Sequence, residues 1–176
     1  MMSGGDLLIV EIPGFTPEIG RLVSMLNYVR STTLAAIADL NVMDLDYLPD
    51  AEGNSIGGLL SHLAGAEVGY QAATFYGREL NEQEHAEWDA ALALGERARG
   101  EIRGRELAHY ISQLDRVRAT TLAELQSRDD SWLDQEATFG NGRRINNYFK
   151  WFHVLSHEVN HRGQIRSLRR LATKNR

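Results

Sequence analysis

The chain contains no cysteine, and this absence removes several kinds of chemistry at once. Disulfide bonds, thiolate-bound metals and a cysteine nucleophile all need a side chain that the sequence lacks. Any thiol that takes part in a reaction must therefore come from a bound small molecule.

Proline is also scarce, and its distribution favours helices. Only three prolines occur among 176 residues, and all of them lie before residue 50. Few helix breakers, together with apolar residues spaced three and four apart, are typical of a mostly helical chain. The sequence shows no evident repeat or low-complexity segment. Its length suits a single domain, residues 1–176, with a full hydrophobic core.

The sequence lacks the basic excess that nucleic-acid-binding domains show. It has 19 lysines and arginines against 24 acidic residues, which gives a net charge of −5. The basic residues near the C-terminus are expected to complement a helix end. Long apolar runs are absent too. The apolar run at residues 7–10 is too short for a signal peptide or a membrane span. We therefore expect a cytoplasmic protein that binds neither nucleic acid nor membrane.

Four long segments with helical periodicity predict an all-α protein, a four-helix bundle. The first begins at Thr16, a good N-cap, followed by Pro17, which is favoured at the first helical position. Apolar residues then recur along one face of each segment, as expected for helices that bury one side. The expected helices cover residues 16–40, 54–77, 105–127 and 145–171.

A long connection, residues 78–103, separates the second and third helices. Such a length permits a crossover, so these two helices can run parallel while the second and fourth run antiparallel. Asn81, followed three residues later by Glu84, resembles a capping box. A shorter helix over about residues 82–94 is therefore expected inside the connection.

The segment before the last helix contains Asn141-Gly142, a dipeptide typical of tight hairpin turns. Either a small β-hairpin or an irregular loop is expected there. The last helix should then bury an apolar face. Its expected members are Phe152, Leu155, Val159, Ile165, Leu168 and Leu171.

Two histidines of the last helix, His157 and His161, lie four residues apart. Residues with this spacing share one helix face, so two imidazoles can bind the same metal ion. His153 extends the series, but the three span about 12 Å along a helix, too far for one ion. The site therefore uses either His153 with His157 or His157 with His161, and we favour the second pair.

A third histidine, His62, lies on the second helix. Antiparallel packing would bring it to a similar height as the histidines of the last helix. Three protein ligands with one open position are typical of a catalytic metal site, and histidine suits zinc, nickel, copper and iron. The alternative is a set of hydrogen-bonded core histidines without metal. Burying neighbouring imidazoles without partners is costly, which favours the metal.

Other polar residues near these histidines are candidates for supporting roles. Glu67 and Glu158 could orient the histidine ligands, because such rings usually donate their second N–H to a carboxylate or carbonyl. Gln164 could hold a substrate or a metal-bound water. Arg162 could bind an anionic group or form a surface ion pair. The catalytic candidates are therefore Gln164, Glu67 and Arg162.

The segments SHLAGAE, residues 61–67, and HEVNHRGQI, residues 157–165, resemble the DinB/YfiT-like superfamily. The resemblance extends over about residues 16–172. It implies a four-helix bundle with up-down-down-up order and a divalent metal, often zinc or nickel. The implied ligands are His62, His157 and His161. It also implies homodimers and a low-molecular-weight thiol as cofactor, since characterised relatives are thiol-dependent S-transferases or isomerases.

These observations lead to competing hypotheses about function. The first is a divalent-metal-dependent enzyme that acts on a small molecule, either as a thiol-dependent S-transferase or as a hydrolase. A bound ion would lower the pKa of a thiol or of water near neutral pH. The second is a non-catalytic metal-binding or stress-response module. The third is a metal-free bundle with a small-molecule pocket.

Overall fold

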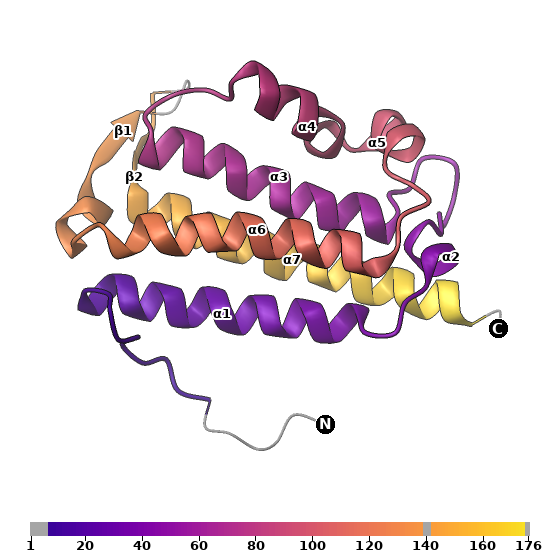
Figure 1. Ribbon diagram of the computed structural model, residues 1–176, viewed down its shortest axis with the longest axis horizontal. Helices are drawn as coiled ribbons and strands as arrows, with labels where there is room; N and C mark the ends of the chain where they lie inside the picture. Colours follow the sequence, from indigo (N-terminus) through magenta and orange to yellow (C-terminus); the bar gives the residue numbers. More distant parts are fainter. Residues whose placement is uncertain (1–6, 139–141, 175–176) are drawn as a thin grey trace.

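Four long helices form a bundle in the computed structural model, which describes residues 7–138 and 142–174 (Figure 1). Helices α1 and α7 run in one direction, and α3 and α6 run in the other. The predicted all-α bundle and its up-down-down-up order are therefore confirmed. The elements are α1 (Pro17–Ile37), α2 (Val42–Leu45), α3 (Ile56–Phe75), α4 (Glu82–Ala93), α5 (Gly95–Glu101), α6 (Leu107–Gln126), a 3-10 helix η1 (Asp130–Asp134), β1 (Glu136–Thr138), β2 (Arg144–Asn146) and α7 (Asn147–Thr173).

The four bundle helices pack in a fixed pattern of neighbours. Helix α1 packs beside α7, α6 packs beside α3, and α3 and α7 pack against each other in antiparallel directions. Helix α4 lies along the outer side of α3 (Figure 1). We call the line of contact between α3 and α7 the α3–α7 seam. Every histidine predicted to bind metal lies on one of these two helices.

The start of α1 is capped from a distant part of the chain. Thr16 occupies the N-cap position, as predicted, but its side chain makes no capping hydrogen bond to the helix. Instead, Oδ1 of Asp130 accepts the backbone N–H groups of Glu18 and Ile19, at 3.1 and 3.0 Å. A carboxylate suits this end of a helix, where N–H groups point outward and the dipole is positive. The cap therefore ties α1 to η1.

The connection between α3 and α6 contains two helices instead of the one expected. Helix α4 begins at the capping box formed by Asn81 and Glu84, and this prediction is confirmed. Helix α5 was not expected, because its glycines resemble helix breakers. Leu94 and Gly95 adopt φ angles of 53° and 58°, which turn the chain sharply between α4 and α5. Helix α5 then begins at that turn.

A small antiparallel hairpin precedes α7. Of the two structures expected there, a β-hairpin or an irregular loop, the hairpin is the one observed. Ala137 of β1 faces Ile145 of β2. Asn141, half of the predicted turn dipeptide, lies outside the described residues. The hairpin ends at Asn146, whose side chain accepts the backbone N–H of Phe149 and caps α7. The hairpin therefore sets the starting point of the helix that carries two of the candidate ligands.

The predicted apolar face of α7 is partly wrong. Phe152, Val159 and Leu171 are exposed by 52%, 37% and 45%. These three side chains lie off the buried line, which admits polar residues at two core positions. A search for apolar side chains alone therefore found Ile165 and Leu168 but also included exposed residues. The buried residues of this line are Trp151, Val154, Glu158, His161, Ile165 and Leu168.

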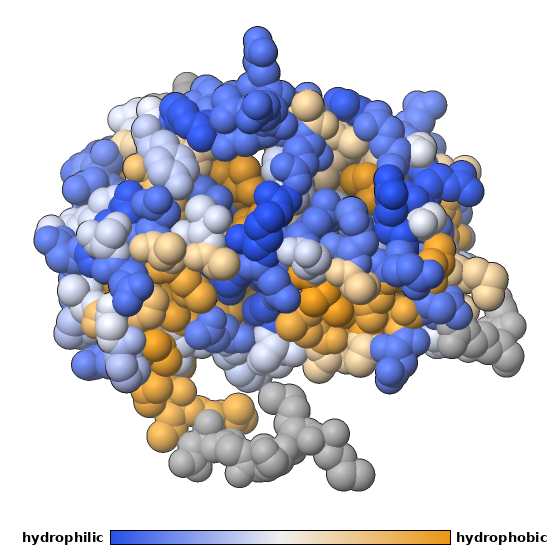
Figure 2. Space-filling view, viewed as in Figure 1, coloured by the Kyte–Doolittle hydropathy of each residue, from blue (hydrophilic) through white to orange (hydrophobic). Residues whose placement is uncertain are grey.

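Two large aromatic residues from the connecting segments are part of the core. Trp88 and Trp132 are both buried. Apolar side chains do reach the surface at the segment before α1, where residues 7–10 are exposed and form the orange extension in Figure 2. Among the described residues, no helix combines the length and apolarity that a bilayer-spanning helix needs.

Candidate metal centre

The three histidines predicted as ligands meet at the α3–α7 seam. Nε2 of His157 lies 3.2 Å from Nε2 of His62 and 3.0 Å from Nε2 of His161. All three donor atoms lie within 4.8 Å of one another. Nitrogen ligands bonded to one zinc ion at ~2.0–2.1 Å in a tetrahedral arrangement would be separated by about 3.3 Å. We call these residues the three-histidine cluster.

The outer ring nitrogens of two cluster residues are fixed by carbonyl groups. Nδ1 of His62 lies 2.9 Å from the backbone oxygen of Ala91 in α4, and Nδ1 of His161 lies 2.9 Å from Oε1 of Gln164. A carbonyl oxygen can only accept a hydrogen bond, so each Nδ1 must be the donor. In the neutral ring, Nε2 then carries a lone pair directed at the centre of the cluster.

The cluster has too few protons to satisfy its own nitrogens. His157 can place a single N–H between its Nε2 and those of its two neighbours, and one N–H cannot point at both. At least one acceptor nitrogen therefore remains without a donor, and a polar atom that is partly removed from water needs compensation. A cation with affinity for imidazole nitrogen supplies it. The donor set therefore fits a divalent transition metal.

Burial favours the uncharged form of two cluster residues, His157 and His62. Burial, aided by the neighbouring rings of His161, His62 and His153, lowers the pKa of His157 to about 4. Burial also lowers the pKa of His62, an effect that the hydrogen bond to Ala91 partly offsets. At neutral pH these two rings are thus unprotonated, and no proton has to be displaced before a metal binds.

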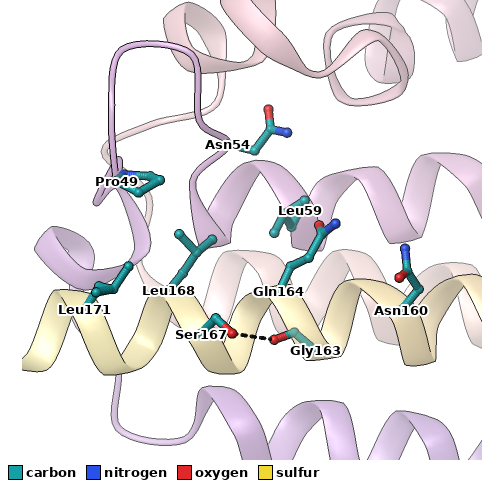
Figure 3. A pocket seen from close by; sticks show the side chains of 9 residues that line it. All are labelled: Pro49, Asn54, Leu59, Asn160, Gly163, Gln164, Ser167, Leu168 and Leu171. Carbon is teal, nitrogen blue, oxygen red and sulfur yellow. Dashed lines mark hydrogen bonds between the residues drawn. The ribbon is translucent and has the colours of Figure 1, made fainter.

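A groove of about 580 Å³ adjoins the cluster at Gln164 (Figure 3). None of the three histidines lines it, but Gln164 both lines the groove and accepts the hydrogen bond from His161. Its lining combines apolar carbons with uncharged amide and hydroxyl groups and contains no charged side chain. The lining residues are Pro49, Asn54, Leu59, Asn160, Gly163, Gln164, Ser167, Leu168 and Leu171.

The glutamates expected to orient the histidines contact arginines instead. Glu67 and Glu158 are 1% and 2% exposed, and both bind Arg30 and Arg118, which are each 6% exposed. The expectation that they hold histidine ligands is therefore wrong. The carbonyls of Ala91 and Gln164 take that role, and a backbone carbonyl leaves no mark in a sequence. We call the two glutamates and two arginines the charge network.

The charge network takes one residue from each bundle helix. Arg30 belongs to α1, Glu67 to α3, Arg118 to α6 and Glu158 to α7. Burial alone would raise the pKa of Glu67, but the charge and hydrogen bonds of Arg118, aided by Arg30 and Thr121, lower it to about 2. The arginines were missed in the sequence. The available signal was their place on the buried faces of α1 and α6, where an unpaired charge would be very costly.

The remaining candidates lie at the edges of the site. Arg162 donates a hydrogen bond to the hydroxyl of Thr32 in α1 and does not line the groove. Its predicted role in binding an anion stays a prediction. His153, the alternative ligand, is exposed and stacks on His157 with ring centroids 5.7 Å apart. It also contacts the ring of Tyr70 in α3, at 5.8 Å.

Comparison with known proteins gives one family and one fold. The family model described as mycothiol-S-transferase matches residues 21–173. The crystal structure of a conserved protein from Enterococcus faecalis is similar with a TM-score of 0.60 and 14% sequence identity. The similarity covers 86% of this chain and 94% of that one, and at this identity it supports the fold alone. Among curated proteins, no significant match was found.

Proposed function

Because the chain belongs to the mycothiol-S-transferase family, part of the DinB/YfiT-like superfamily, we propose that it is a metal-dependent enzyme that transfers a small thiol to an electrophile. The family match covers most of the chain and confirms the resemblance drawn from the two histidine segments. Of the two reactions left open by the sequence, it favours thiol transfer over hydrolysis. The lack of cysteine agrees, since no internal thiol would compete with the substrate.

The observation that carries the proposal is the convergence of three imidazole nitrogens with too few protons to satisfy one another. We propose His62, His157 and His161 as ligands of a divalent ion, with zinc or nickel as the first candidates. When bound, such an ion supplies positive charge that favours a thiolate over a thiol near neutral pH. The chain itself contributes preorganisation, because Ala91 and Gln164 fix the direction of two rings.

The groove beside Gln164 is the proposed binding place for the rest of the thiol. Its polar groups are the amides of Asn54, Asn160 and Gln164 and the hydroxyl of Ser167, all uncharged. Groups of this kind donate and accept hydrogen bonds without selecting a charge. They suit mycothiol, which is uncharged apart from its thiol and rich in hydroxyl groups, better than the charged glutathione. Because Gln164 contacts both groove and His161, a thiol bound there would lie next to the cluster.

The proposal is tested first by metal analysis of protein purified without an affinity tag. We expect about one equivalent of a transition metal per chain. His157→Ala should lose it, while His153→Ala, which changes the neighbouring ring one turn away, should retain it. Loss in the second variant and retention in the first would show that the ligand set is misassigned.

Activity is tested with the metal-loaded protein, mycothiol and a fluorogenic haloalkyl electrophile. We expect conjugation faster than the uncatalysed reaction, and slower conjugation with glutathione or bacillithiol. His109→Ala, an exposed histidine on α6, serves as the control that should keep full activity. Stoichiometric metal without turnover of any thiol would leave the non-catalytic metal-binding module as the better description.

A further inference from the structure

The charge network reveals an internal relation between two halves of the bundle. Nη1 of Arg30 in α1 donates to the carbonyl of Leu114 in α6 at 2.8 Å. Nη1 of Arg118 in α6 donates back to the carbonyl of Leu26 in α1 at 3.0 Å. In each helix the accepting leucine lies four residues before the arginine. The two contacts are thus equivalent under exchange of α1 and α6.

The sequences around these residues follow the same relation. Residues 26–33 read LNYVRSTT, and residues 114–121 read LDRVRATT, so both fit the pattern L-x-x-V-R-x-T-T. In both segments the leucine, the valine, the arginine and the last threonine are buried. The expectation of a chain without repeats is therefore wrong. Eight positions are too few to stand out, and only the reciprocal contacts show that the segments play equivalent parts.

Helices α3 and α7 correspond in the same way, with a constant offset. Ser55 and Asn146 each cap their helix by accepting the backbone N–H three residues further on. Glu67 and Glu158, which lie 12 residues after these caps, each bind an arginine of the charge network. The neighbours agree, since α1 packs beside α7 as α6 packs beside α3 (Figure 1). An approximate two-fold axis therefore relates α1 to α6 and α3 to α7.

We infer that the α3–α7 seam holds a second ligand position, formed by His153, Ala66 and Tyr70, which is the two-fold counterpart of the three-histidine cluster. The offset that relates the caps and the glutamates places His153 at the equivalent of His62. Ala66 and Tyr70 then stand where α7 has its two ligand histidines. Each position thus has one imidazole at the corresponding place, His62 in the cluster and His153 in the counterpart. The counterpart lacks the other two imidazoles.

Contacts across the seam agree with this assignment. The rings of Tyr70 and His153 have centroids 5.8 Å apart, and their equivalents, His161 and His62, have centroids 4.9 Å apart. Among the described residues, no hydrogen bond occupies the Tyr70 hydroxyl or the ring nitrogens of His153. One imidazole and one phenol are too few donors for a stable metal site. They suit a hydrogen-bonding oxygen of a molecule bound in the seam.

The inference is tested by completing the counterpart with A66H and Y70H together. The two introduced imidazoles should join His153 and raise bound zinc from one to two equivalents per chain, measured after equilibration with a weak chelator. This expectation rests on the metal binding proposed for the three-histidine cluster, so the unaltered chain is measured alongside. An unaltered chain without metal would count against the proposed function, whereas the counterpart is judged on the second equivalent alone.

A second experiment removes ligands from the three-histidine cluster and asks whether the completed counterpart then binds the metal instead. H157A/H161A should hold no zinc, and adding A66H/Y70H to that background should restore one equivalent. Adding H153A to A66H/Y70H should remove the second equivalent but not the first. A folded A66H/Y70H protein with one equivalent, or a second equivalent that survives H153A, would overturn the inference.

A single substitution covers the case in which the double change prevents folding. Y70H in the H157A/H161A background places two imidazoles across the seam, at the positions of Tyr70 and His153. Nickel binding that disappears on addition of H153A would support the counterpart position. A folded protein that binds no nickel, or binds it independently of His153, would overturn it.

Discussion

The charge network and the three-histidine cluster are neighbours in the core, yet only one of them is complete within the chain. Glu158 directly follows His157, and both groups span α3 and α7. In the charge network, every carboxylate oxygen accepts at least one hydrogen bond from an arginine. In the cluster, three imidazole nitrogens converge, and a single N–H of His157 cannot satisfy both of its neighbours.

This difference separates a structural polar core from a candidate functional site. Four buried charges of balanced sign stabilise or specify the fold only if all of them remain paired. Three imidazole rings with converging nitrogens lack a partner that the chain could supply. Burial of polar side chains therefore does not by itself mark a site, whereas converging ring nitrogens that the chain cannot all satisfy point to a ligand.

The largest expected effect comes from breaking the charge network. Arg118→Ala would leave Glu67 and Glu158 with a single arginine in the core, which should cost about 3–5 kcal/mol of stability. Arg116→Ala, on the exposed side of the same helix, should change stability by less than about 0.5 kcal/mol. Urea unfolding of both variants measures the difference. Equal effects would mean that the network is not a distinct structural unit.

Acid should affect the two groups in different pH ranges when the protein is free of metal. The folded-state pKa of His157 is about 4, below its usual 6.5, so the unfolded chain takes up this proton first. Stability should therefore fall as pH drops from 6.5 towards 4. Glu67, at about 2 instead of 4.5, should cause a second loss between pH 4.5 and 2.

Urea unfolding over a pH series shows whether these two losses are separate. His157→Asn should reduce the loss in the first range, to which His62 also contributes, and leave the second in place. Glu67→Gln should reduce the loss in the second range while the first persists, because Glu84 also has its pKa lowered to about 2. A single loss of stability with falling pH that neither substitution changes would contradict the assigned pKa shifts.

A smaller effect is expected from the residue that links cluster and groove. Gln164→Ala removes the acceptor for Nδ1 of His161, and loss of such a partner typically lowers metal affinity by about 10–100-fold. Ser167→Ala, which also lines the groove but contacts no histidine, should leave metal affinity unchanged. Competition with a chromogenic chelator measures both. Equal affinities in the two variants would show that Gln164 does not orient its neighbour.

The sequence predicted the features that depend on local spacing. Helical periodicity gave the four bundle helices, and the pair Asn81 and Glu84 gave α4. The four-residue spacing of His157 and His161 predicted that they point at one place, and the structure brings His62 to them. These predictions succeeded because each rests on residues within one or two helical turns.

The features that were missed depend on contacts between distant residues. Asp130 caps α1 although it lies more than a hundred residues further along the chain. Arg30 and Arg118 occupy core positions only because glutamates from other helices neutralise them. On α7, Glu158 and His161 interrupt the apolar line, so the apolar pattern pointed to Phe152 instead. Each of these partners is fixed only once the helices are packed.

Helix α7 is the last helix of the bundle to be synthesised, so the contacts that depend on it form last. While the ribosome is still making the first half of the protein, Arg30 has neither Glu158 nor the carbonyl of Leu114 beside it, and His62 stands alone. Five consecutive residues of α7, 157–161, later bring the missing counter-charge and both remaining imidazoles. Core neutralisation and assembly of the candidate ligand set thus both wait for the same short segment of α7.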